Sequence, residues 1–254
     1  MKHNTRQFAV ICKIEFLLFL RDFFSFFFTI VFPVLMLVLF GSIYGNTPLY
    51  PGSSLKSMDV SVPAYAVMVI SVTGLMAFPL TLAGYKEKKI YKRFDATPAG
   101  KKTIILAQII INLVMTFIGI GILLAAGKIL YHIQILGTAA AISAGLLFSV
   151  ACMFSMGFFF TAIARDAKIT NLLCYLSYFV MLFLSGATIP DMLFPANVKK
   201  AAAFLPMTHA VDLMQGVFAG DGLGSHAKEL LILGALSVVL TSAGAVLYRK
   251  KDWA

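Results

Sequence analysis

The chain has 254 residues, of which 60% are hydrophobic and 13% are charged, and its mean hydropathy is +0.90. Soluble globular domains are about 45–50% apolar and about 25% charged, so a water-soluble enzyme with this composition would lack the polar surface to cover its core. Intrinsic disorder is excluded as well, because it requires low hydrophobicity and high charge. The composition therefore indicates an all-α protein that crosses a membrane several times.

Six stretches without Asp, Glu, Lys or Arg divide the chain, and they are 19 to 36 residues long. A helix needs about 20 apolar residues to cross the hydrocarbon core, and a charge at its centre costs roughly 2.5–3.5 kcal/mol. The sequence therefore predicts six transmembrane helices, at about 23–45, 61–84, 103–127, 136–163, 169–187 and 229–248. The longest stretch is assigned a single helix, because the polar residues His132 and Gln134 occupy its start.

The distribution of basic residues predicts the orientation of these helices. With both termini in the cytoplasm, the cytoplasmic segments hold sixteen Lys and Arg residues and the external segments hold five. This agrees with the positive-inside rule, so we expect a multi-pass protein of the plasma (inner) membrane with cytoplasmic N- and C-termini. The net charge of +10 is explained by contact with anionic lipid headgroups and does not indicate a nucleic-acid partner.

Residues 5–22 precede the first span and are predicted to form an amphipathic helix in the cytoplasmic interface. An apolar stripe at helical spacing is formed by Phe8, Cys12, Phe16 and Phe19, and the cations Arg6, Lys13 and Arg21 lie off it. A plain N-terminal extension of the first span is the alternative. Near the outer end of that span, Gly41 and Gly45 form a GxxxG pair, which is a weak signal for close contact with another helix.

The loop at 85–102 (YKEKKIYKRFDATPAGKK) follows the second span, and seven of its 18 residues are Lys or Arg. The spacing of Glu87, Ile90, Tyr91 and Phe94 places them on one side of a helix. One interpretation is a basic loop that only sets the topology. The apolar and aromatic side favours the other, a short surface helix that docks a second protein. The next helix is then capped by the Thr-Pro pair at 97–98.

The external segment 188–228 is not uniformly hydrophilic, because short apolar stretches alternate with prolines such as Pro190 and Pro206. None of these stretches is long enough to cross the bilayer. Since unpaired backbone polar groups are costly at the membrane edge, we predict a re-entrant or interfacial helical hairpin in the outer leaflet. Thr208 is expected to cap a helix that runs toward Gly216.

Sequence patterns for intrinsic catalysis are absent. There is no GxxxxGK[ST] phosphate loop, no GxSxG or HExxH element and no clustered set of metal ligands, and the three cysteines are widely spaced. No Asp or Glu falls in the middle of a predicted span, which counts against an ion-coupled carrier. We therefore expect no catalytic residue, no metal site and no cofactor in this chain, so a partner must supply the energy for uphill transport.

The order of these parts resembles the membrane subunit of ABC-2-type exporters over essentially the whole chain. Residues 87–98 (EKKIYKRFDATP) are similar to the family's acidic–basic run that ends in an Ala-Thr-Pro-like element. Residues 184–190 (LSGATIP) and 205–209 (LPMTH) are similar to its Ser-Gly…Pro and Leu-Pro-x-Thr elements. One departure is Gln215, which stands where many members have a basic residue and puts in doubt a cation at the outer mouth.

The resemblance implies two six-span subunits, identical or different, around a central path, with separate cytosolic ABC ATPase subunits that bind ATP and Mg. Coupling to the ATPase is assigned to Glu87, Lys88, Ile90, Tyr91, Arg93 and Phe94, with Glu87, Tyr91 and Phe94 as the main contacts. An external gate is assigned to Gly186, Pro190, Pro206, Thr208 and His209.

We therefore expect the permease subunit of an ATP-driven exporter of amphipathic or hydrophobic compounds, such as drugs, antibiotics or lipids. The Phe- and Met-rich spans fit an apolar, adaptable path, although the same residues also simply face lipid. Export of a lipid-linked glycan or a peptide by the same architecture is an alternative. A stand-alone carrier or channel and a membrane-anchored interaction protein are further alternatives. A neighbouring gene for an ATPase without membrane spans would favour the exporters.

Overall fold

The structure is a computed structural model that describes residues 2–45, 47–48, 56–95, 100–188 and 194–250. Among these residues it contains six helices that are long and apolar enough to cross a membrane, which confirms the predicted number. The six candidate spans are Phe23–Tyr44, Ser57–Glu87, Lys102–Tyr131, Ala139–Ile163, Ala167–Leu184 and Leu223–Tyr248. Each lies within a few residues of its predicted position.

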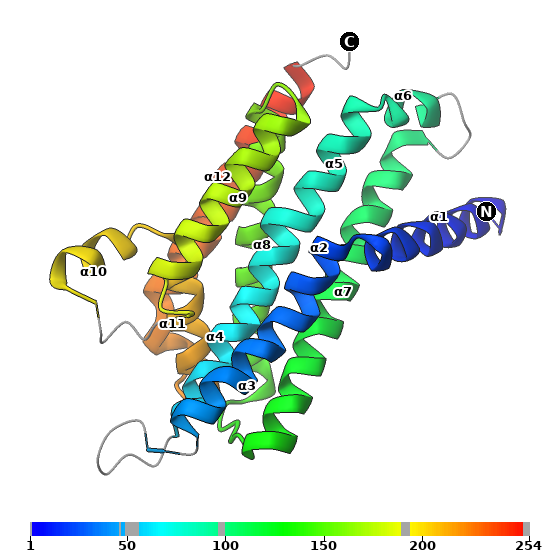
Figure 1. Ribbon diagram of the computed structural model, residues 1–254. Coiled ribbons are helices and arrows are strands. Elements are labelled where there is room, and N and C mark those ends of the chain that lie inside the picture. The colour runs from blue at the N-terminus through cyan, green and yellow to red at the C-terminus, as the bar shows by residue number, and fades with distance from the viewer. Residues whose placement is uncertain (1, 46, 49–55, 96–99, 189–193, 251–254) are drawn as a thin grey trace.

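The spans run side by side in one bundle, which is shown in Figure 1. The first three spans and the segments around them are α1 (Lys2–Arg21), α2 (Phe23–Phe26), η1 (Phe27–Val31), α3 (Phe32–Tyr44), α4 (Ser57–Val72), η2 (Thr73–Ala77), α5 (Phe78–Glu87), α6 (Ile90–Asp95) and α7 (Gly100–Tyr131). The remaining elements are α8 (Ala139–Ile163), α9 (Ala167–Leu184), α10 (Ala196–Ala202), α11 (Pro206–Ala219), η4 (Leu223–His226) and α12 (Ala227–Lys250).

The first two spans each contain a π-helical turn that is followed at once by a Phe-Pro pair. The turn η1 precedes Pro33, and the turn η2 precedes Pro79. Proline has no N–H to donate and its ring presses on the preceding helical turn, and a π turn relieves both problems by adding a residue. A proline inside a span favours a kink, and both Pro33 and Pro79 lie inside predicted spans, but the π turns before them are found only in the structure.

The second span is the centre of the bundle. In its most apolar window 89% of the residues are buried, compared with 11% for the last span, Leu223–Tyr248. Helices α3, α7, α8, α9 and α11 surround it, whereas α12 packs mainly on α8. Gly157 of α8 lies against the backbone carbonyl of Gly74, so a side chain at position 157 would collide with that carbonyl. Two glycines thus allow α8 to approach the central span closely.

Helix α1 crosses α7 at a steep angle to the bundle (Figure 1). Its inward side carries the predicted stripe of Phe8, Cys12, Phe16 and Phe19, together with Ile11. A second set of apolar residues on α1 is exposed, namely Val10, Ile14, Leu17 and Leu18. The predicted stripe therefore packs on protein, and the exposed set is available to lipid. The position of α1 in the membrane interface stays a prediction.

The predicted external hairpin contains two helices of different character. Helix α10 projects from the bundle (Figure 1) and exposes Lys199 and Lys200. Helix α11 is buried through Met207, Ala210, Val211, Leu213, Met214, Val217 and Phe218, and it packs on α4 and α8. It begins at Pro206, so the prediction that Thr208 is its N-cap is wrong. Proline suits the first helical position because its φ angle is already helical. Re-entry into the membrane stays a prediction.

The two glycines of the GxxxG pair have separate roles in this chain. Gly41 packs against the ring of Tyr131 on α7, and a side chain at position 41 would collide with that ring. Gly45 ends α3 with a positive φ of 52°, a conformation that favours glycine. Both positions are therefore accounted for within one subunit, Gly41 by a contact and Gly45 by its backbone conformation.

Candidate functional site

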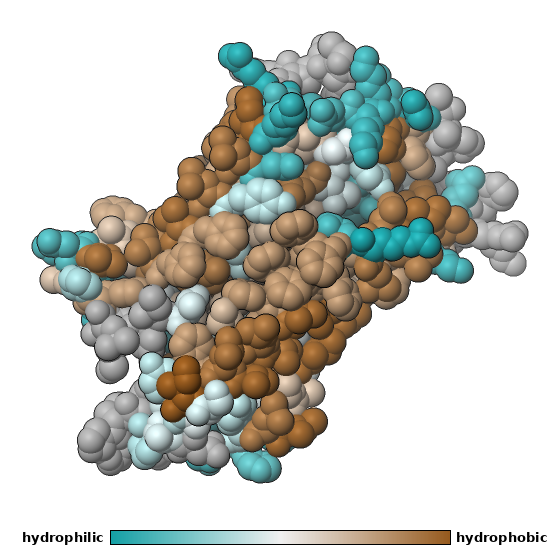
Figure 2. Space-filling view, viewed as in Figure 1, coloured by the Kyte–Doolittle hydropathy of each residue, from teal (hydrophilic) through white to brown (hydrophobic). Residues whose placement is uncertain are grey.

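Basic side chains gather at one end of the bundle, where α5 meets α6 and α8 turns into α9. Figure 2 shows this hydrophilic cap above a largely apolar flank. The exposed cations at this end include Lys88, Lys89, Lys92, Arg93, Arg165 and Lys168. We call this region the basic end. Its assignment to the cytoplasm rests on the positive-inside rule and stays a prediction.

Helix α6 is separated from α5 by a sharp turn that the sequence pattern does not reveal. The last turn of α5 closes with backbone hydrogen bonds from Lys88 N to Gly84 O and from Lys89 N to Lys86 O, each 3.0 Å long. Lys89 then takes a left-handed conformation with φ +55°, and α6 begins at the next residue. Glu87 therefore belongs to α5 and is exposed, and it does not continue the side formed by Ile90, Tyr91 and Phe94.

The apolar side of α6 faces the bundle of its own subunit. Tyr91 is only 1% exposed and packs in a cluster with Leu82 and Ile104, and Ile90 and Phe94 are half-buried against the same cluster. The Tyr91 hydroxyl donates a 2.8 Å hydrogen bond to Gln108 Oε1 on α7. Burial raises the pKa of Tyr91 well above its usual range, so the phenol stays a proton donor.

Contact of the predicted coupling residues with a partner therefore stays a prediction, but the structure distinguishes two roles among them. The buried Tyr91 ring anchors α6 to α5 and α7. Glu87, Lys88 and Arg93 are exposed, as are Lys89 and Lys92, so these charged residues form the accessible surface of the corner.

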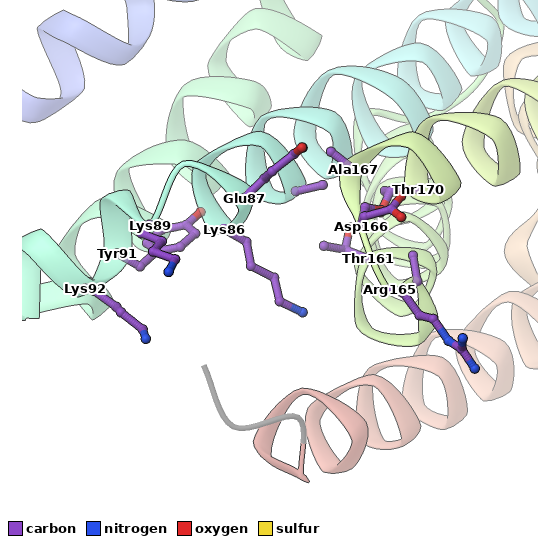
Figure 3. Close-up of a pocket in the computed structure, with 12 residues that line it drawn as sticks. Lys86, Glu87, Lys89, Tyr91, Lys92, Thr161, Arg165, Asp166, Ala167 and Thr170 are labelled. Atoms are coloured by element: carbon purple, nitrogen blue, oxygen red, sulfur yellow. The ribbon is translucent and has the colours of Figure 1, made fainter. Parts of the chain in front are cut away.

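A cleft of about 210 Å³ lies between the α5–α6 corner and the α8–α9 turn (Figure 3). Its charged lining consists of Lys86, Glu87, Lys89, Lys92, Arg165 and Asp166. Asp166 also caps α9, because its carboxylate accepts a 2.8 Å hydrogen bond from Ile169 N. With four cations and two acids the cleft is positive, which suits an acidic segment of a partner.

A second cleft, of about 280 Å³, lies between α1, α5 and α7. It contains Glu15, a carboxylate that is only 6% exposed. Burial raises the pKa of Glu15, and hydrogen bonds from Tyr85 and Gln108 partly oppose this effect. The sequence interpretation missed Glu15. The signal was its position four residues from both Ile11 and Phe19, which places an acid in the middle of a buried stripe.

A column of buried polar residues continues from this cleft along α7. Gln108, Asn112 and Thr116 follow one another at intervals of four residues and are all buried. Asn112 Nδ2 donates to Gln108 O over 2.8 Å, and Thr116 Oγ1 approaches both Asn112 O and Thr73 Oγ1 at 2.7 Å. The column thus joins α6, through Tyr91, to the π turn η2. The sequence interpretation missed this column. Its signal was the regular spacing of polar residues within a stretch that contains no charged residue.

The opposite end of the bundle is held together by backbone hydrogen bonds. Asp59 is buried in the first turn of α4 and accepts hydrogen bonds from Lys56 N (2.9 Å) and Gln134 N (2.8 Å). Leu136 N donates to Phe218 O of α11 over 3.0 Å. The segment 132–138, α4 and α11 therefore form one fastened unit, which we call the closed end.

The predicted gate residues are only partly brought together. Pro206, Thr208 and His209 lie in the first turn of α11, and His209 Nε2 is 3.0 Å from the carbonyl of Ala203. Gly186 follows the end of α9 with φ +81°. Pro190 lies outside the described residues. The role of this set as a gate stays a prediction.

The amino-acid sequence matches a family model described as "ABC-2 type transporter" over residues 6–219. It is also similar to Nodulation protein J of Rhizobium leguminosarum bv. viciae, with 29% identity over 134 residues. That alignment covers 52% of this chain and 50% of the relative, so it spans about half the length of each protein.

Proposed function

The chain belongs to the ABC-2 type transporter family, and from this we propose that it is the membrane-spanning permease subunit of an ATP-driven exporter. In this proposal ATP and Mg are bound by separate cytosolic ABC ATPase subunits, and a second permease subunit completes the transport path. The cargo is an amphipathic or hydrophobic compound such as a drug, an antibiotic or a lipid. Support for such a cargo comes from spans whose central parts contain no Asp, Glu, Lys or Arg.

The observation that carries the proposal is the construction of the basic end around α6. The exposed residues Lys89, Lys92 and Arg93 offer cations to an acidic partner. The buried Tyr91 fastens the same short helix to α7, whose polar column reaches the centre of the bundle. A partner that moves α6 would therefore act on α7 and η2 as well. Nucleotide-dependent movement of the ATPase would then bias the packing of the spans.

The test is a reconstituted complex of this chain with the ATPase from a neighbouring gene. The double variant Lys89→Gln/Lys92→Gln removes two exposed cations of the basic end. An exposed ion pair is typically worth about 0.5 kcal/mol, so the loss of two should weaken retention of the ATPase roughly fivefold, with a parallel loss of transport.

The matched control is Lys199→Gln/Lys200→Gln, which removes two exposed cations from α10. It should retain the ATPase as the unmodified chain does. Equal losses in the two double variants would indicate a general charge effect and contradict docking at α6. A chain that transports its cargo without any ATPase would overturn the proposed function as a whole.

A further inference from the structure

The cleft between α1, α5 and α7 brings several hydrogen-bond acceptors together. Glu15 from α1 and Asp22 from the α1–α2 junction contribute carboxylates, and Asn112 contributes an amide from α7. No ion pair joins either carboxylate to a basic side chain within the part of the chain that the structure describes. Asp22 accepts a hydrogen bond from Ser25, which leaves further lone pairs on its carboxylate.

Asn112 supplies a second, independent indication of a ligand site. It is only 4% exposed, and its Oδ1 has no hydrogen-bond partner among the described residues. A buried amide oxygen without a partner is costly, because the desolvation of the group is not compensated. Two carboxylates and one amide oxygen in the same cleft match the three donors of a primary ammonium group. A cation there would also favour the charged form of Glu15.

The rest of the lining has the character of a lipid site. Lys88 is the cation of the cleft, and the apolar side chains of Leu18, Phe19, Leu80 and Ile111 complete its walls. The exposed apolar residues of α1, Val10, Ile14, Leu17 and Leu18, adjoin this region along the same helix. An amphiphile whose chains lie along this apolar surface would present its headgroup to the polar part of the cleft.

We propose that this cleft binds the headgroup of an amine-bearing zwitterionic phospholipid, such as phosphatidylethanolamine. Glu15, Asp22 and Asn112 receive the ammonium group, and Lys88 pairs with the phosphate. A bound lipid would join α1 to α5 and α7 beside the α6 corner. The site goes beyond the proposed transport function, because a resident lipid requires neither cargo nor ATP.

The test measures lipid binding to the purified full chain in detergent by native mass spectrometry, with no ATPase present. Short-chain phosphatidylethanolamine should bind at least tenfold more tightly than phosphatidylcholine, whose trimethylated nitrogen has no hydrogen to donate. Phosphatidylglycerol, which has no amine, should bind as weakly as phosphatidylcholine. Equal binding of the ethanolamine and choline lipids would overturn the proposal, and so would a preference for phosphatidylglycerol.

Variants locate the binding within the cleft. Glu15→Gln keeps the size of the side chain and an oxygen that accepts from Tyr85, and it should weaken the binding of phosphatidylethanolamine about tenfold. The controls Glu87→Gln and Lys89→Gln change neighbouring charges that line the other cleft, and they should bind the lipid normally. If Glu15→Gln does not yield folded protein, Asp22→Asn and Lys88→Gln test the same cleft at exposed positions. Unchanged binding in these variants would overturn the assignment.

Two further probes separate a lipid from other amines. Glycerophosphoethanolamine has the headgroup without chains and should bind much more weakly than the lipid. Dodecylammonium has a chain and an amine without phosphate, and it should also bind more weakly. Equal binding of the first would indicate a site for soluble amines, and equal binding of the second a site for cationic amphiphiles. Either result would overturn the assignment to a phospholipid.

Discussion

At the closed end of the bundle, Asp59 accepts hydrogen bonds from two backbone N–H groups, and Leu136 N pairs with Phe218 O. At the basic end, by contrast, one cleft lies between the α5–α6 corner and the α8–α9 turn, and a second cleft, between α1, α5 and α7, contains the buried carboxylate of Glu15. Charge follows the same division, because the exposed cations of α6 and the α8–α9 turn lie at the basic end. Among the described residues, hydrogen bonds to backbone groups thus connect the elements of the closed end, and clefts lie between the elements of the basic end.

This difference suggests how a bundle of helices responds to a partner. Movement requires an element with more than one packing arrangement, and clefts between helices allow such arrangements more readily than hydrogen bonds that connect the elements. A partner that acts on α6 would therefore move the basic end while the closed end holds its geometry. Substitutions that weaken each end separately test this difference.

The largest effect is expected at the closed end from Asp59→Ala. The substitution leaves Lys56 N and Gln134 N without their acceptor at a buried site. The loss of charged hydrogen bonds together with unsatisfied donors should lower the free energy of unfolding by about 3 kcal/mol. Unfolding in mixed micelles with increasing denaturing detergent measures the change.

The matched control is Asp221→Ala, because Asp221 has a side chain that is 57% exposed and lies 3.3 Å from the ring of His226. Its removal should cost less than about 0.5 kcal/mol. Comparable losses for the two aspartates would mean that the backbone bonds of Asp59 do not fasten this end.

The sequence predicted the spans well and their internal detail poorly, for one physical reason. A charge in the hydrocarbon core is costly wherever it stands, so charge-free stretches locate spans such as Ala139–Ile163 without knowledge of the fold. The roles of Glu15 and Asn112 depend on which helices face them, and helical spacing alone does not give that information. The left-handed turn at Lys89 was missed because lysine carries no local signal for a positive φ.

Helical spacing was equally insufficient to predict the packing of α6 at the candidate site. The spacing of Ile90, Tyr91 and Phe94 predicted one apolar side, and the structure contains it. An apolar side on a surface helix suits either a partner or the bundle itself, and only the packing against Leu82 and Ile104 decides for the bundle. The spacing of the apolar residues therefore could not predict that Tyr91 is buried.

An intermediate effect is expected at the basic end from Tyr91→Phe. This variant keeps the buried ring and removes the 2.8 Å hydrogen bond to Gln108. The loss should lower the free energy of unfolding by about 1 kcal/mol. Since the ring is an anchor and its hydroxyl is buried, retention of the ATPase should stay unchanged while cargo-stimulated ATP turnover falls.

Tyr131→Phe is the control, because the hydrogen bond of the Tyr131 hydroxyl to a described residue is the long, 3.4 Å contact with Val38 O. Its effect on the free energy of unfolding should be smaller than that of Tyr91→Phe. Weaker retention of the ATPase by Tyr91→Phe would show instead that the hydroxyl contacts the partner directly, and would return Tyr91 to the docking surface.

The smallest effect is expected in the middle of the bundle, where the polar column ends. Thr116 Oγ1 lies 2.7 Å from both Thr73 Oγ1 and Asn112 O, and its single proton serves one of these acceptors at a time. Thr73 has acceptors on its own helix as well, since its hydroxyl lies 3.1 Å from Val69 O and Ile70 O.

A double-mutant cycle of Thr116→Val and Thr73→Val isolates the bond between the helices, because valine keeps the shape of threonine. We expect a coupling energy of about 0.6 kcal/mol, the usual size for hydrogen bonds between helices in membranes. A coupling energy of zero would mean that both hydroxyls are satisfied within their own helices. The polar column would then not stabilise the packing of α7 on η2.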